Sequence, residues 1–274
     1  MPSPPPGSMV PMLLSADPWS QDEMQRLAIA LRAPRRQEEF PGHAERARFV
    51  GAGCVVDFFR RSRSLRWRAR PSAAVFPVTT LSPLSAVEAV SAEGATLLGA
   101  EVGLQGDGPL RAHHAEPQPA MAFVEAESPA GALTTRAVLQ ANTSSLHFYW
   151  DGTPISNARL DVTIGARQTV EGINLFWNRP LREGPAIRTL TLPQLDAALR
   201  CKGLGQSRWV GAPVLLYRAG YPNVRQALLV PLYRVDVRVG REVATVYCTA
   251  FLRAAAPLLP TEALSPYLGD VLPL

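Results

Sequence analysis

Short strand-like segments joined by tight turns are the feature that most restricts what this chain can fold into. Between Tyr233 and Val239, apolar residues alternate with charged ones, which is typical of a strand with one buried and one solvated face. Turns at Asp151-Gly152 and at Gly240 directly follow such segments. Parallel strands need a long crossover between them, whereas a turn of a few residues joins antiparallel neighbours. The sequence therefore predicts antiparallel sheets and argues against a parallel, doubly wound fold.

Three helices are expected among these strands. Ser20 and Glu23 have the spacing of a capping box, and apolar residues at helical spacing follow them. Pro83 and Pro193 each open an Ala-rich segment as a first-turn proline, and the helix that begins at Pro83 should end near Gly99. Helices followed by antiparallel strands predict the α+β class, with two to three modules, each of one helix packed on an antiparallel β-sheet.

Stretches rich in proline and glycine predict how the chain is divided. Its 274 residues suffice for one large domain or for two to three small ones. We expect a flexible N-terminal arm at 1–17, an N-terminal helix plus β-hairpin module at 18–74, a central α+β module at 75–182, a C-terminal α+β module at 183–256 and a Pro-rich tail at 257–274.

Several strand motifs resemble those of PepSY-type modules and the related extracytoplasmic regulators of sensor kinases. They are Asp151-Gly152-Thr153-Pro154-Ile155, Val170-Glu171-Gly172-Ile173, Trp177-Asn178-Arg179-Pro180 and the segment from Leu229 to Val235. The resemblance covers about residues 75–253. It implies small α+β units without catalytic residues that bind or inhibit partners, as in protease propeptides and cell-envelope proteins.

Six arginines crowd into one short stretch of this basic chain. Lys202 is the only lysine among 28 basic residues, and the net charge is +5. The excess of arginine is either the imprint of a GC-rich genome or a choice of guanidinium groups that bind phosphate or carboxylate. In the strand expected at Leu65–Arg70, every second side chain is an arginine, so one face of that strand is basic. The candidate binding residues are Arg60, Arg61, Arg63, Arg66, Arg68 and Arg70.

This basic face has three interpretations. It is a solvated strand face whose arginines protect a sheet edge from pairing, a contact surface for an acidic protein or a membrane surface, or a site that neutralises the phosphates of a nucleic acid. The sequence spells no recognition helix, zinc finger or RNA-binding platform of aromatic and basic residues, which disfavours nucleic acid.

Consecutive aromatic residues precede the turn at Asp151. In a strand, Phe148, Tyr149 and Trp150 must point alternately to the two faces, so at least one lies under a second layer or stays exposed. Core packing between helix and sheet is one interpretation. The other is an exposed patch that contacts a partner or a second copy, for which Tyr149 and Trp150 are the candidate residues.

Candidate chemistry is sparse. His113, His114 and Glu116 could begin a metal site, but adjacent histidines in extended chain point apart, and His43 and His147 are remote in sequence. The sequence contains no motif of a catalytic nucleophile, and its three widely spaced cysteines define neither a disulfide framework nor a metal site. We expect no catalytic residue, no metal and no cofactor. The alternative is a hydrolase or metal-dependent enzyme assembled from distant His, Asp and Glu residues around His113 and His147.

Neither a membrane anchor nor an export signal is predicted. No apolar run reaches the roughly 18 residues of a membrane span, and the first twenty residues lack the basic start of a signal peptide. We therefore expect a cytoplasmic location. The predicted function is that of a non-enzymatic binding, regulatory or structural protein, which presents β-sheet surfaces to a protein partner or to a second copy. Binding of an anionic ligand or a nucleic acid through Arg60–Arg70 is a further alternative.

Overall fold

The computed structural model describes residues 4–37, 45–70, 76–79, 82–104, 108–127, 133–219 and 226–251. The helices are α1 (Gln21–Ala30), α2 (Pro83–Val90), α3 (Ala92–Glu101) and α4 (Leu192–Arg200), with a short 3₁₀ helix η1 at Gln206–Arg208. The strands are β1 (Met9–Ser15), β2 (Arg35–Gln37), β3 (Arg46–Val50), β4 (Cys54–Phe59), β5 (Ser64–Ala69), β6 (Leu110–His114), β7 (Gln118–Glu127), β8 (Leu133–Trp150), β9 (Thr153–Gly165), β10 (Val170–Phe176), β11 (Pro180–Arg188), β12 (Val214–Arg218), β13 (Leu228–Leu229), β14 (Pro231–Val239) and β15 (Glu242–Thr249).

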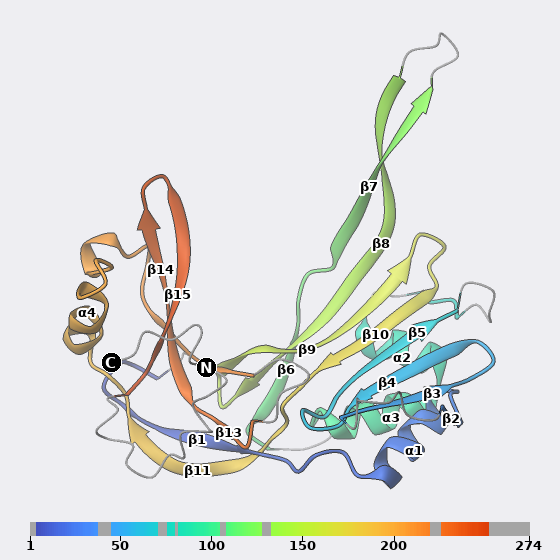
Figure 1. Cartoon of the computed structure of the whole chain (residues 1–274), viewed down its shortest axis with the longest axis horizontal. Helices are drawn as coiled ribbons and strands as arrows, with labels where there is room; N and C mark the ends of the chain where they lie inside the picture. Colours follow the sequence, from blue (N-terminus) through green and yellow to red (C-terminus); the bar gives the residue numbers. More distant parts are fainter. Residues whose placement is uncertain are drawn as a thin grey trace.

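Most strands belong to one twelve-stranded sheet (Figure 1). Its main path runs in the order β15-β14-β12-β9-β10-β5-β4-β3-β2, and β8 pairs with β9, β6 and β7. Among the described strands, β9 and β12 pair in parallel and all other neighbours in this sheet are antiparallel. These pairings confirm the α+β class with antiparallel sheet. The structure is richer in strand than the expected pattern of one helix per module. The long strands β8 and β9 pair with strands from both halves of the chain and so join them into a single sheet.

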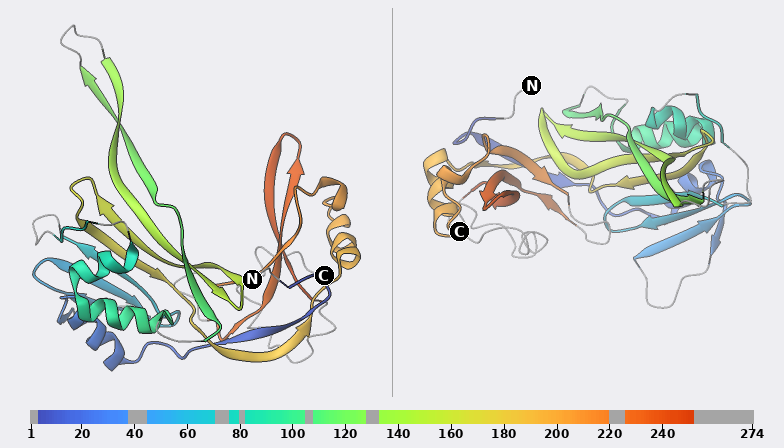
Figure 2. Two further views of the ribbon diagram at one scale, coloured as in Figure 1. Left: turned by 180° about the vertical axis from the view of Figure 1, so that it is seen from behind. Right: turned by 90° about the horizontal axis from the view of Figure 1, so that it is seen from above.

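Helices α1, α2 and α3 gather on one face of this sheet (Figure 2). Helix α2 contacts β8, β9 and β10, and α1 contacts α3. The sheet residues Trp67, Val162 and Ile173 are fully buried on this face. The indole Nε1 of Trp67 donates a hydrogen bond to the carbonyl oxygen of Leu31, 3.0 Å away, where the chain leaves α1. Burial of the apolar stripe on each strand thus fixes which face of the sheet the helices cover and which face they leave open.

The helix expected from Pro83 to Gly99 is two helices. Ser91 has extended backbone (φ −167°, ψ 126°) and separates α2 from α3. Its side chain accepts a hydrogen bond from the backbone N–H of Gly94, 3.1 Å away, so this serine caps the second helix. The apolar spacing continued across the break, but the local bond between the serine hydroxyl and the backbone decided the structure.

A second, three-stranded sheet has the order β11-β1-β13. Strand β1 lies inside the expected flexible arm at 1–17, so that part of the arm is ordered sheet instead. It pairs with β11 on one edge and with β13 on the other. Its backbone is held further by Tyr217, whose hydroxyl donates to the carbonyl oxygen of Pro11 at 2.6 Å. The Pro-rich tail expected at 257–274 lies outside the described residues, and the remaining domain boundaries stay predictions.

Local turn and capping signals in the sequence are confirmed. Asp151 and Gly152 have φ of 45° and 77° and connect β8 to β9, as a two-residue hairpin turn requires. The capping box of Ser20 and Glu23 is present in full. Strand β6 pairs with the end of β8 that leads into the turn at Asp151. No helix within the described ranges is long and apolar enough to cross a membrane.

Candidate functional site

The open face of the large sheet is the first part of the candidate site. Here the strands run side by side, and their registers align polar residues in rows. One row crosses from β3 to β8 and consists of Arg48, Asp57, Arg66, Asn174, Asp161 and Ser145. Arg68 on β5 and Thr163 on β9 lie in the next row. We call this surface the open arginine face, which comprises Arg46, Arg48, Asp57, Arg66, Arg68, Arg159, Asp161 and the residues between them.

Asp57 organises the open arginine face. Its carboxylate is 0% exposed and bonds Arg48 Nε at 2.6 Å, Arg46 Nη2 at 2.7 Å and Arg68 Nη2 at 3.2 Å. Burial acts to raise the pKa of Asp57, but hydrogen bonds from Arg48 and Arg46 outweigh it and hold this pKa below its usual value. The aspartate is therefore a fixed negative charge that orients three guanidinium groups.

The alternation expected on β5 is confirmed, but the face is not uniformly basic. Leu65 and Trp67 are buried, while Arg66 and Arg68 are exposed on the other side. Arg68 shares Asp57 with two other arginines. Arg66 has no hydrogen-bond or ion-pair partner among the described residues, and it is the least constrained cation of the row.

The turn before β5 takes three of the predicted arginines away from this face. Arg60 Nε donates to the carbonyl oxygen of Trp19 at 3.1 Å, and Arg61 forms an ion pair with Glu45. Arg70 is exposed just beyond the end of β5. Arg63 is buried, as described next, so four of the six predicted arginines lie outside the open arginine face.

Arg63 serves the core. Its guanidinium binds Glu101 at 2.8 Å and Glu23 at 2.9 Å, and it lies 4.0 Å from the centre of the Trp19 ring. Burial works against the charge of Glu23, but its hydrogen bonds from Arg63 and Ser20 lower its pKa to about 2. Arg63 also has φ of 57°, which a turn rather than a strand requires. These contacts join the β4–β5 turn to α1 and α3, so Arg63 has a structural role.

The two predicted aromatic residues have opposite environments. Trp150 is 4% exposed, and its Nε1 donates to Glu183 Oε1 at 3.3 Å, so it cannot contact a partner. Tyr149 is half-buried, and its ring meets the ring of His113 edge-on, with centroids 4.7 Å apart. Tyr149 alone of this pair belongs to the open side of the sheet.

Only two of the histidines in the described residues lie next to each other. His113 and His147 lie directly opposite each other in the β6–β8 ladder, whereas His114 is opposite Leu146 and points to the other face. Within the described ranges, no group of three or more His, Cys, Asp or Glu residues could hold a metal ion. His43 lies outside the described residues. In the described part of the chain, two of the four histidines, His113 and His147, therefore lie together. No carboxylate or thiolate of the described residues joins them to complete a metal site.

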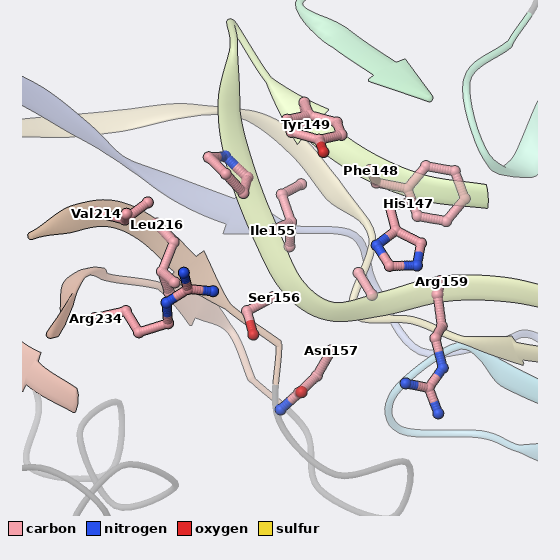
Figure 3. Close-up of a pocket in the computed structure, with 12 residues that line it drawn as sticks. His147, Phe148, Tyr149, Ile155, Ser156, Asn157, Arg159, Val214, Leu216 and Arg234 are labelled. Atoms are coloured by element: carbon pink, nitrogen blue, oxygen red, sulfur yellow. The ribbon is translucent and has the colours of Figure 1, made fainter. Parts of the chain in front are cut away.

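A cavity where the sheet divides is the second part of the candidate site (Figure 3). In the β8–β9 ladder, His147 pairs with Arg159 but Phe148 pairs with Ile155, so residues 156–158 form a bulge on β9. On its other edge, β9 pairs with β12 at Ile155 and with β10 from Arg159 onward. The bulge therefore marks the fork of the sheet, and the hollow beside it has a volume of about 370 Å³.

The cavity lining is cationic and apolar. Arg159 and Arg234 contribute guanidinium groups, and Ser156, Asn157 and His147 contribute neutral polar groups or imidazole. None of the lining residues carries a carboxylate. Sequence reasoning missed this cavity, although a signal for its backbone existed in Asn157, an asparagine that takes the left-handed φ of 67°.

Comparisons with known proteins add little. No family model matches this chain, and no curated protein matches it. Among solved structures, it is similar to an uncharacterized protein from Eubacterium rectale ATCC 33656 at 12% identity and a TM-score of 0.37, covering 89% of this chain and 84% of that one. It is also similar to the Bacillus megaterium YpeB C-terminal domain at 8% identity and a TM-score of 0.31, covering 86% of this chain and 95% of that one. Likenesses this weak carry no argument about function.

Proposed function

We propose that this protein is a non-enzymatic binding protein, and that the open arginine face binds an acidic segment of a protein partner. The observation that supports the proposal is the composition of this face. It bears five arginines, Arg46, Arg48, Arg66, Arg68 and Arg159, against two aspartates, Asp57 and Asp161. That is a surplus of three positive charges on a surface that no described helix covers (Figure 2).

The arginines of this face are held in position before any partner arrives. The guanidinium of Arg46 lies over the Phe59 ring at 5.8 Å, and that of Arg159 lies over the Phe176 ring at 4.9 Å. Asp161 Oδ2 also accepts from Arg159 Nε at 2.7 Å. Because less side-chain freedom is lost on binding, such fixed guanidinium groups favour association with carboxylates.

An acidic polypeptide fits this surface better than a nucleic acid. Single-stranded nucleic acids gain affinity by stacking bases on exposed aromatic faces. Here the rings of Phe59 and Phe176 are each covered by an arginine of the same face, so they do not offer such a platform. The same proposal includes three predictions that we made from the sequence. They are a PepSY-like architecture, the partner-binding role that this resemblance implies, and a cytoplasmic location.

The test is a charge change with a matched control. The test variant, R66E with R68Q, alters two exposed arginines, of which Arg66 has no described partner; the control, R238E with R241Q, makes the same charge change at exposed sites around the β14–β15 turn. The probe is a fluorescently labelled Glu-rich peptide, and the measurement is its anisotropy at low salt. We expect the test variant to bind about tenfold more weakly and the control to bind within about twofold of the wild type.

Other outcomes overturn the proposal. One is equal weakening by the control, which would show that only the net charge matters. Another is wild-type protein that binds single-stranded DNA or phosphatidylglycerol vesicles but not the peptide at equal ionic strength. Loss of DNA binding in the test variant alone would then favour the nucleic-acid interpretation of the same face.

A further inference from the structure

We propose that the cavity at the fork of the sheet binds a small, elongated organic dianion, with a carboxylate at each end and an aliphatic middle. This goes beyond the proposed function, because it concerns a small molecule and a hollow, not a macromolecule and an open surface. The volume of about 370 Å³ lies within the usual range for small-molecule pockets.

The two ends of the cavity are both cationic (Figure 3). Arg234 points toward Ser156 at one end, while Arg159 and His147 lie together at the other. Ile155 lies between them in this view, and Pro154 and Ala158 also line the hollow. Two charged ends separated by an apolar wall match a ligand with the same distribution of charge.

Arg234 has unused hydrogen-bonding capacity. Its Nε is buried and has no hydrogen-bond partner within the described ranges. Its Nη2 lies 3.7 Å from Asp236 Oδ2, which is too far for a hydrogen bond. Asp236 instead accepts a hydrogen bond from Thr245 Oγ1 at 2.7 Å. A buried donor without an acceptor costs free energy, and a ligand carboxylate at this end would supply the acceptor.

Arg159 uses only one of its three guanidinium nitrogen atoms in hydrogen bonds to the described residues. Its Nε binds Asp161 Oδ2 at 2.7 Å, which fixes the direction of the guanidinium group. Its two terminal amino groups have no hydrogen-bond partner in the described part of the chain, and its side chain is 48% exposed. The Arg234 side chain is 43% exposed, so both ends of the cavity reach solvent, and a second carboxylate can be held by Arg159 while part of it stays in water.

The bulge on β9 creates the hollow and keeps its backbone rigid. Asn157, at the centre of the bulge, has left-handed φ, and its Nδ2 donates to the carbonyl oxygen of Ala219 at 3.5 Å. Ser156 at the same time pairs with Arg218 of β12. Since these contacts tie the bulge to β12 and to the residue that follows it, the cavity exists before a ligand enters, which favours affinity.

The experiment is isothermal titration calorimetry on the full chain with succinate, glutarate, adipate and suberate, and with hexanoate as a monoanion. We expect at least one dicarboxylate to bind with Kd below about 1 mM, and hexanoate to bind at least about fivefold more weakly. R234Q and R159Q should each weaken the best dicarboxylate by about fivefold to tenfold. R238Q, which alters an exposed arginine on the same strand as Arg234, should leave its Kd unchanged.

A cavity-filling variant separates loss of the cavity from loss of charge, and its melting temperature shows whether it is folded. S156F changes no charge, and we expect it to abolish dicarboxylate binding while its melting temperature stays near that of the wild type. Absence of binding by every dicarboxylate, equal loss in R238Q, or unchanged affinity in S156F would each overturn the proposal. R234Q should still bind the Glu-rich peptide as the wild type does, so that failure of this inference and failure of the acidic-partner proposal can be distinguished.

Discussion

Replacing Asp57 with asparagine tests whether its carboxylate both stabilises the open arginine face and orders it for binding. The substitution D57N keeps the size of the side chain and one carbonyl acceptor, but it removes the negative charge shared by Arg46, Arg48 and Arg68. Three guanidinium groups would then face one another around a neutral amide. We therefore expect the variant to be less stable and to bind the acidic peptide more weakly, because the three arginines would have to be ordered on binding.

The size of the stability loss follows from the burial of the four groups. Removing one partner of a fully buried ion pair costs about 3–5 kcal/mol. Asp57 is 0% exposed, but its partners keep 23%, 37% and 51% of their side chains exposed, so water can solvate part of the charge left behind. We expect the free energy of unfolding to fall by about 2 kcal/mol, which corresponds to a melting temperature lower by roughly 4–8 °C for a chain of this size.

The pH dependence identifies the charge as the cause. The folded-state pKa of Asp57 is lowered, so its stabilisation is present above the unfolded-state pKa of about 3.9 and is lost as the pH falls through the folded-state value. Urea unfolding of wild type and D57N should give free energies that differ at pH 7 and converge below about pH 4. Peptide binding measured at pH 7 should be several-fold weaker in D57N, because the cost of ordering Arg46, Arg48 and Arg68 outweighs the rise in surplus positive charge from three to four.

Two results would refute this reasoning. If D57N is as stable as the wild type within about 0.5 kcal/mol at pH 7, the carboxylate does not hold the three arginines. If the difference in stability persists unchanged at low pH, the loss comes from packing of the amide and not from the charge. D236N is the control, since Asp236 lies on β14, outside the open arginine face, and its side chain is 31% exposed.

Two further predictions concern the body of the fold. Alanine at Gly51 would place its Cβ against the carbonyl oxygen of Arg32, so we expect G51A to lower the free energy of unfolding by about 3 kcal/mol in urea unfolding. The control is G172A, whose Cβ would meet Thr163 at an ordinary contact distance of 3.6 Å. It should change the free energy of unfolding by less than about 1 kcal/mol. A thiol reagent should modify one cysteine per native chain, the exposed Cys201, because Cys54 and Cys248 are buried and burial raises the pKa of Cys248 to about 11; fast modification of a second thiol would contradict this.

The parts of the fold that the sequence predicted are those decided within a few residues. The hairpin turn at Asp151-Gly152 and the capping box of Ser20 depend on bonds between near neighbours in the chain. Strand β1 could not be predicted in this way, because its sequence is interrupted by Pro11 and its partners are β11 and β13, more than a hundred residues away. Pairing with distant strands overrode the local composition.

The candidate site was predictable only along single strands. Alternation on β5 predicted that Arg66 and Arg68 share a face, and the same alternation at Arg46 and Arg48 is a signal for two more arginines on one side of β3. The position of Asp57 opposite Arg66 depends on the register between β4 and β5. A shift of one residue would place Val56 there and turn the aspartate to the covered face, and no pattern within one strand excludes that shift.

The register also explains why the surface that we propose to bind an acidic partner contains a buried carboxylate. A cluster of arginines alone would repel one another and sample many rotamers, and ordering each of them on binding would cost about 0.5–1.5 kcal/mol. Asp57 removes most of that cost for Arg46, Arg48 and Arg68 by holding them in the free protein. Arg66, which lies between Asp57 and Asn174 and has no ionic partner in the described residues, is then the one cation of the row whose charge is uncompensated. A carboxylate of a partner would meet Arg66 first, and the neighbouring arginines would already be in position to bind the carboxylates that follow.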